Sequence, residues 1–169
     1  MKAFAKLIWV PAAFALIPAG ALAQNPASGL PPVAPAAIID AAQSCGNAVT
    51  TERLDEQRLA ADGWTLGSVT NNGRAADTPL RFFSRNSIML VTTPGEASCF
   101  VMARLESRQS FVAVRDGMTA AFGRPFRADA SGMTQWILTE SRAAQLDATG
   151  SREQPAVRIS IIHMSGNNQ

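Results

Sequence analysis

The stretch that decides the fold is residues 87–105, SIMLVTTPGEASCFVMARL. Two runs of branched and apolar residues flank Pro94-Gly95. Proline fixes φ at the second position of a turn, and glycine supplies the positive φ that the third position needs. The second run places every other residue on one apolar face, as in a half-buried strand: Cys99, Val101, Ala103 and Leu105. We therefore predict a β-hairpin over residues 87–105.

Upstream of this hairpin the pattern is first helical and then extended. Residues 36–44 carry apolar side chains at helical spacing, and we expect Gly46-Asn47 to interrupt this helix. A second helix, capped by a threonine at position 50 or 51, should end at Gly63, because glycine readily adopts the left-handed conformation of a helix stop. Short strands are then expected at residues 64–69 and 81–83.

Downstream of the hairpin, residues 110–122 have an amphipathic helical pattern that ends at Gly123. Strands are expected at 133–139 and 156–164, and the polar segment 140–155 between them reads as a long loop. Strands that are grouped together and joined by short turns favour an antiparallel arrangement. The prediction is an α+β fold, with a sheet of about six or seven strands and helices packed on one face. Two helical segments, each followed by strands, hint at two α-plus-β units.

The N-terminal segment indicates export. Lys2 and Lys6 precede an apolar run over residues 7–19, and Ala21-Leu22-Ala23 forms a small-x-small cleavage pattern. An uncleaved membrane anchor is the alternative, but the run is shorter than a bilayer span and holds two prolines. We expect a signal peptide at 1–23, a flexible Pro/Ala-rich lead-in at 24–35, one domain at 36–164 and a disordered tail at 165–169. The expected location is periplasmic or secreted, with no stable membrane insertion after cleavage.

Charge argues against nucleic acid as a partner. Both lysines lie in the predicted signal peptide, which leaves 13 arginines against 13 Asp and Glu residues. A domain with no net charge lacks the positive field that draws proteins to nucleic acid or anionic membranes. The expected partner is instead an unknown protein or a small apolar ligand.

The two cysteines, Cys45 and Cys99, are far apart in the sequence. In an exported protein, an even number of widely spaced cysteines predicts a disulfide. Closing a loop of this length would stabilise the fold by roughly 4 kcal/mol in the chain-entropy account. Two free buried thiols are the alternative.

Catalytic and metal sites find little support in the sequence. One histidine and two distant cysteines do not make a zinc site, and no phosphate-binding loop or nucleophile elbow is present. No metal, cofactor or catalytic residue is therefore assigned. The acidic group Glu52, Asp55 and Glu56, or His163, could serve a small exported hydrolase, which we keep as an alternative function.

The aromatic residues supply the remaining candidates for a binding site. Phe82 and Phe83 are adjacent in a predicted strand, so they should point to opposite faces, and one of them could leave the core. We take Phe82, Phe83, Trp136 and His163 as possible ligand or partner contacts. The function expected from the sequence is a non-catalytic binding or interaction module of the cell envelope. A pocket for an apolar ligand is a further alternative.

Overall fold

The computed structural model describes residues 29–68, 70–71, 74–75 and 78–164. The predicted signal peptide, the first part of the lead-in and the predicted tail lie outside the described residues. Within the lead-in, residues Pro32–Val33 form a short strand, β1, which pairs in parallel with Arg104 and Leu105.

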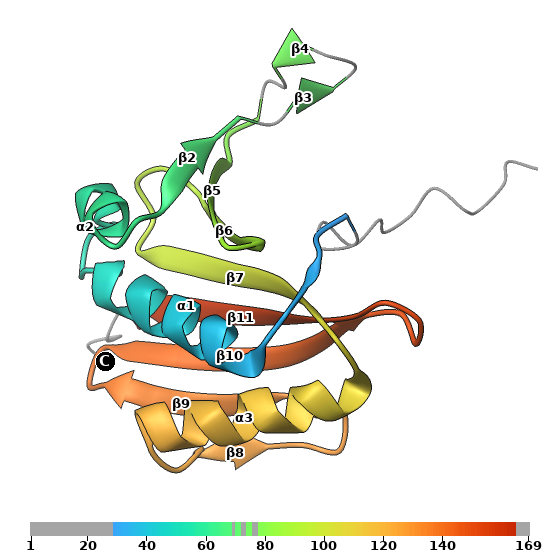
Figure 1. The fold of residues 1–169 in the computed structure, drawn as a ribbon. Coiled ribbons are helices and arrows are strands. Elements are labelled where there is room, and N and C mark those ends of the chain that lie inside the picture. Colours follow the sequence, from blue (N-terminus) through green and yellow to red (C-terminus); the bar gives the residue numbers. More distant parts are fainter. Residues whose placement is uncertain (1–28, 69, 72–73, 76–77, 165–169) are drawn as a thin grey trace, which may run out of the picture.

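The described residues form an α+β fold, as predicted, with an antiparallel sheet and helices packed against it (Figure 1). The helices are α1 (Pro35–Ala48), α2 (Glu56–Ala61) and α3 (Arg108–Phe122). The main strands after β1 are β2 (Thr65–Gly67), β5 (Arg81–Arg85), β6 (Ile88–Thr92), β7 (Ser98–Leu105), β8 (Arg127–Ala128), β9 (Thr134–Thr139), β10 (Arg142–Gly150) and β11 (Pro155–His163). A separate small pair consists of β3 (Thr70–Asn71) and β4 (Arg74–Ala75).

The sheet order is β2-β5-β6-β7-β11-β10-β9-β8. The sheet therefore consists of two runs of four antiparallel strands, β2-β5-β6-β7 and β8-β9-β10-β11, which meet where β7 and β11 pair antiparallel. Helices α1 and α2 precede the first run in the sequence, and α3 precedes the second. This arrangement matches the two α-plus-β units that the sequence hinted at.

The central hairpin has the predicted geometry. β6 and β7 are joined by a turn in which Glu96 N donates to Thr93 O over 3.1 Å, and Gly95 has a φ of 81°. The alternating residues of β7 are buried on the helix side of the sheet, where Cys99, Val101 and Ala103 have no exposed surface.

The first helix differs from the prediction, because α1 continues through Gly46 and Asn47 to Ala48. Gly46 is buried, and a Cβ at this position would lie 3.5 Å from Leu138 and 3.7 Å from Ile161. Gly46 is therefore an interior residue of the helix, packed against the sheet, and does not end it. The cap of α2 also differs: Asp55, not a threonine, accepts hydrogen bonds from Gln57 N and Arg58 N.

The predicted loop at 140–155 was wrong, because most of it is the nine-residue strand β10. Ala144 and Leu146 are buried in the core, while Gln145 and Asp147 point to the other face. Alanine, glutamine and aspartate have low strand propensity, which hid this strand. It is stabilised by antiparallel partners on both sides, β9 and β11. The sheet therefore has slightly more strands than expected.

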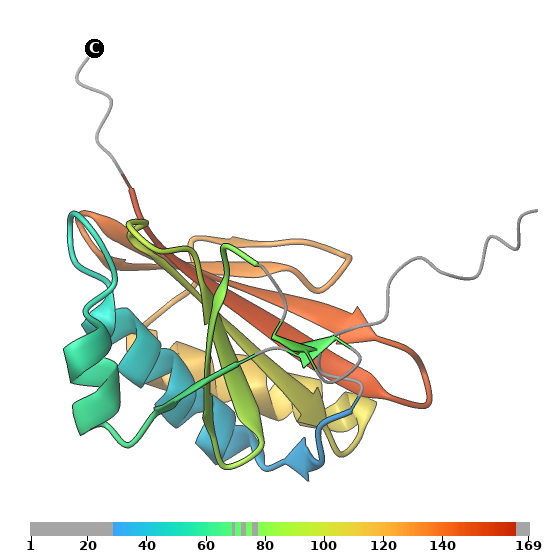
Figure 2. The ribbon, with the colours of Figure 1, turned by 90° about the horizontal axis from the view of Figure 1, so that it is seen from above.

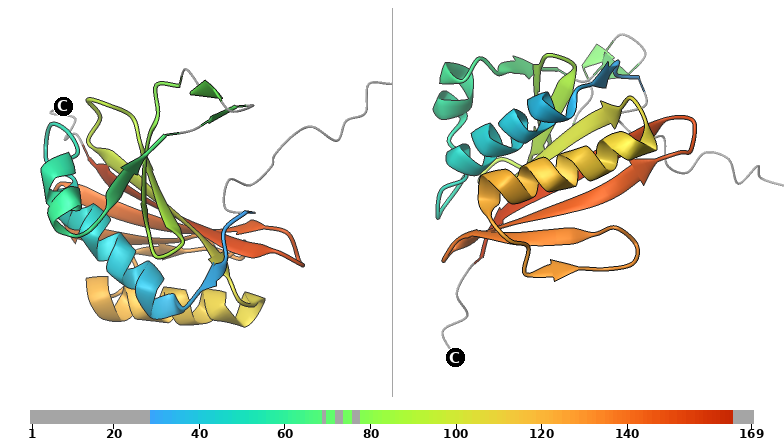
Figure 3. Two further views of the ribbon diagram at one scale, coloured as in Figure 1. Left: turned by 45° about the horizontal axis from the view of Figure 1, so that its top comes forward. Right: turned by 60° about the horizontal axis from the view of Figure 1, so that its bottom comes forward.

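The core lies between the sheet and the helices (Figure 2). Helices α1 and α3 lie side by side on one face of the sheet (right panel of Figure 3). Their buried residues include Ile38, Ala42, Val114 and Met118. Among the described residues, no helix has the length and apolar character needed to cross a membrane.

Cys45 of α1 and Cys99 of β7 lie at disulfide distance, with their Cα atoms 6.0 Å apart. This is the pairing that the sequence predicted. Both residues are fully buried. The bond therefore ties the last turn of the first helix to a central strand.

Candidate functional sites

The face of the sheet opposite the helices carries none of the described helices, and we call it the open face (Figure 3). Side chains of directly paired residues point to the same face of a sheet. One row of such partners crosses seven strands: Phe82, Val91, Phe100, Ser160, Gln145, Gln135 and Arg127. A second row runs beside it: Ser84, Met89, Met102, Arg158 and Asp147.

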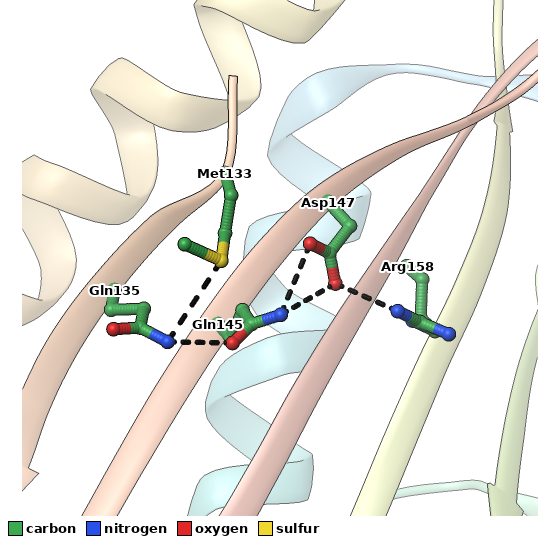
Figure 4. A network of polar contacts seen from close by, with 5 residues as sticks. All are labelled: Met133, Gln135, Gln145, Asp147 and Arg158. Carbon is green, nitrogen blue, oxygen red and sulfur yellow. Dashed lines mark hydrogen bonds and ion pairs between the residues drawn. The ribbon is translucent and has the colours of Figure 1, made fainter. Parts of the chain in front are cut away.

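The two rows differ in chemistry from one end to the other. On β5, β6 and β7 most of their side chains are aromatic, aliphatic or methionine, whereas on β11, β10 and β9 they are polar or charged, and we call these parts the apolar half and the polar half. A third row on the polar half is apolar, with Ile162, Ala143 and Ile137. The polar half forms a connected network (Figure 4). Gln135 Nε2 donates to Gln145 Oε1 over 2.7 Å, and Gln145 Nε2 donates to both Asp147 oxygens. Arg158 Nη2 completes the network with an ion pair of 3.0 Å to Asp147 Oδ2.

A small apolar hollow of about 270 Å³ lies at the corner of the open face. Its lining includes Phe126, Ile162 and Met164, with the small side chain of Ala143 among them. Phe126 is 59% exposed and Ile162 is 43% exposed. The hollow touches the polar network through Gln135 and Gln145.

The structure separates the four contact residues expected from the sequence. Phe83 and Trp136 are buried in the core, at 3% and 0% exposure. Phe82 lies on the open face, so the adjacent phenylalanines do point to opposite sides of the strand. His163 ends β11, and its backbone N donates to Ala97 O over 2.9 Å. Contact with a partner through Phe82 or His163 stays a prediction.

A second concavity lies on the other side of the molecule, and we call it the helix-side groove. Its volume is about 650 Å³. Its polar lining comes from the exposed side of α1, the end of α2, and the strand ends at the β5–β6 and β9–β10 turns: Asp40, Gln43, Asn47, Asp62, Arg85, Thr139 and Arg142. Phe122 at the end of α3 and Leu138 of β9 add apolar surface.

The two arginines of the groove are held in place. Arg85 forms an ion pair with Asp40 and donates to Asp62 O over 2.6 Å. Its guanidinium carbon lies 4.6 Å from the centroid of the Trp64 ring. Arg142 donates to the carbonyl oxygens of Gly46 and Val49 at the end of α1.

The acidic residues considered for hydrolysis have structural partners. Asp55 caps α2, and Glu56 forms an ion pair of 2.8 Å with Arg81. Glu52 lies in an exposed turn in which its backbone N donates to Thr50 Oγ1. The three residues line a concavity of about 700 Å³ together with Arg81, and catalysis by them stays a prediction.

Neither a cluster of metal-ligating residues nor a shifted pKa marks a further site in the part of the chain that the structure describes. No group of three or more His, Cys, Asp or Glu residues gathers there in a way that could hold a metal. The pKa of Asp129 is lowered, mainly because the Ser131 hydroxyl donates to its carboxylate and also because Ser131 N and Met133 N do so. These hydrogen bonds close the turn between β8 and β9.

Sequence reasoning missed the polar half of the open face. Gln145, Asp147 and Arg158 become neighbours only because β10 and β11 pair in this register. The one available signal was the alternation of small or apolar with polar residues over 142–150. This signal is weak because alanine, glutamine and aspartate have low strand propensity.

Comparison with protein-family models, curated proteins and solved structures finds no match to this chain.

Proposed function

We propose that this protein is an exported, non-catalytic binding module whose open face contacts a protein partner. The observation that carries the proposal is the continuous row of apolar side chains on β5, β6 and β7, of which Phe82, Phe100 and Met102 are half-buried, beside the hydrogen-bonded network of β9, β10 and β11. Contiguous apolar surface outside the core marks interaction sites in many proteins. Aromatic and methionine side chains with a polar surround are also typical of protein interfaces.

Two features support the export part of the proposal. The first 23 residues have the order of a secretory signal: basic start, apolar run and small-residue triplet. The paired cysteines fit an oxidising compartment, because disulfides persist there and are rare where thiols are kept reduced.

The experiment is site-specific photo-crosslinking in the source organism. A benzophenone side chain at Met102, on the apolar half of the open face, should give one discrete crosslinked product. The same probe at Val112, which is 46% exposed on α3, should give none. Adding Phe100→Glu to the Met102 probe should remove the product, because a charge would then face the apolar contact. Equal products at both positions, or a product that Phe100→Glu leaves unchanged, would contradict the proposal.

The apolar hollow favours one alternative, a small apolar ligand. Ala143→Phe would fill the hollow without touching the Phe100 region of the face. If the function is to bind a small apolar ligand there, Ala143→Phe should abolish binding of a fluorescent fatty acid. If the partner is a protein on the apolar half, the crosslink at Met102 should persist in this variant.

A further inference from the structure

We infer that the helix-side groove is a second binding site, and that its ligand is an uncharged saccharide. The groove is independent of the open face, since it lies on the helix side of the sheet. Its volume of about 650 Å³ falls within the range of ligand pockets, about 300–1,000 Å³.

The guanidinium groups of the groove are fixed before any ligand arrives. Arg85 is held by Asp40, by the Asp62 carbonyl and by the Trp64 ring, and its side chain is 21% exposed. Arg142 is held by the carbonyl oxygens of Gly46 in α1 and of Val49, which caps that helix, and by Thr139 Oγ1, which accepts from its Nε over 3.4 Å. A guanidinium has five N–H groups, so each retains donors beyond these contacts. Donors that are already ordered cost little entropy when a ligand binds.

Helix α1 contributes groups that both donate and accept. Gln43 and Asn47 are four residues apart, so they lie on one helix face, and both are exposed toward solvent. Cys45 lies between them in the sequence, and its bond to Cys99 anchors this turn of the helix to β7. The positions of the two amides are therefore set by a covalent link to the sheet.

The charge of the lining selects against ions. Asp40 and Asp62 balance Arg85 and Arg142, so the formal charge of the lining is zero. An anionic ligand would face two carboxylates, and a cationic ligand would face two guanidinium groups. A ligand without charge avoids both penalties.

Hydroxyl groups match this lining best. Each hydroxyl both donates and accepts, so a row of them can pair with carboxylates, amides and guanidinium groups together. Phe122 and Leu138 offer apolar surface on which the C–H face of a sugar ring can lie. These features together define a neutral saccharide rather than an acid, an amine or an apolar ligand.

The test is binding to an array of neutral oligosaccharides of two to four units, including glucans, mannans and N-acetylated chitooligosaccharides. The best binder is then titrated while backbone amide resonances are followed by NMR. We expect shifts at Asn47, Thr139 and Arg142, and none at Phe100 or Ser160 on the open face. Asn47→Leu should weaken binding about tenfold or more, since it removes donor and acceptor together. Gln109→Leu, at an exposed position of α3 outside the groove, is the matched control and should bind normally.

Three results would overturn the inference: no neutral oligosaccharide bound at millimolar concentration, shifts located on the open face, or tighter binding of an acidic oligosaccharide such as a polygalacturonate fragment. Circular dichroism of Asn47→Leu checks the fold, which should persist because leucine favours a helix more than asparagine does. None of these results bears on the crosslink at Met102, so the open-face proposal is tested separately.

Discussion

Arg142 donates a hydrogen bond to the carbonyl oxygen of Gly46, a residue 96 positions earlier in the chain. The same Nη1 atom also donates to Val49 O over 3.4 Å. The last carbonyl groups of a helix have no partner within the helix, and the last turn of α1 contains no basic residue of its own. A side chain from the start of β10 therefore caps the first helix and joins the two units of the fold.

Arg142→Ala should lower the free energy of unfolding by about 1–2 kcal/mol, because it leaves two helix-end carbonyl groups without their charged donor. Urea denaturation followed by circular dichroism would measure this. Arg152→Ala, at an exposed position of the β10–β11 loop, is the control and should change stability by less than about 0.5 kcal/mol. Equal changes in unfolding free energy in the two variants would show that the Arg142 hydrogen bonds do not contribute to stability.

Gly117→Val should destabilise the protein by about 1–3 kcal/mol, the usual cost of forcing extra volume into a packed contact. A Cβ at Gly117 would collide with the Ile39 side chain where α3 crosses α1. Ile39→Ala in the same chain should recover part of the loss, and a double-mutant cycle would measure the coupling. If the changes in unfolding free energy of the two substitutions simply added, the contact between Gly117 and Ile39 would be contradicted.

The double variant Cys45→Ala/Cys99→Ala should lose about 2–4 kcal/mol of stability, because the disulfide restricts the unfolded chain. Both cysteines are fully buried, so a reductant should act only after unfolding. Alkylation and intact mass, with and without urea, would check this. Rapid alkylation of both sulfurs in the native protein without reductant would mean that the bond does not form.

The Asp129 carboxyl should titrate below its ordinary pKa of 3.8. A pKa that is lower in the folded state adds stability at pH values above 3.8, and this stability is lost as the pH falls through the folded value. Carboxyl ¹³C NMR would follow the titration. Ser131→Ala should raise the pKa of Asp129, because the hydrogen bond from the Ser131 hydroxyl is the largest cause of its lowering. An unchanged value in that variant would refute the assigned cause.

The chain purified from its natural compartment should begin at Gln24. Cleavage after Ala23 is the expected outcome for a signal peptide that ends in a small-x-small triplet. Intact mass spectrometry would decide, and a mature protein that retains Met1 would contradict export by this route.

Local chemistry made part of the fold predictable. The Pro94-Gly95 turn and the alternation of β7 identified the central hairpin, because both signals lie within a few residues. The adjacent Phe82 and Phe83 were correctly expected to diverge, since strand geometry alone requires it.

Other features depended on contacts between distant segments. Helix α1 continues through Gly46, which is buried against Leu138 and Ile161 of the distant strands β9 and β11. Strand β10 is held by β11 along its whole length and by β9 over residues 142–146. The groove could not be predicted either, because its lining residues are far apart in the sequence. Folding places Asp40 beside Arg85, and Asn47 near the turn before Arg142.

The position of β11 determines when the two halves of the sheet can join. This strand follows the other described strands in the sequence, yet it lies at the middle of the sheet, between β7 and β10. Until its nine residues pair, β7 and β10 each present an unsatisfied inner edge. Docking of β11 therefore closes the sheet, and before that step both edges are open to mispairing with other chains.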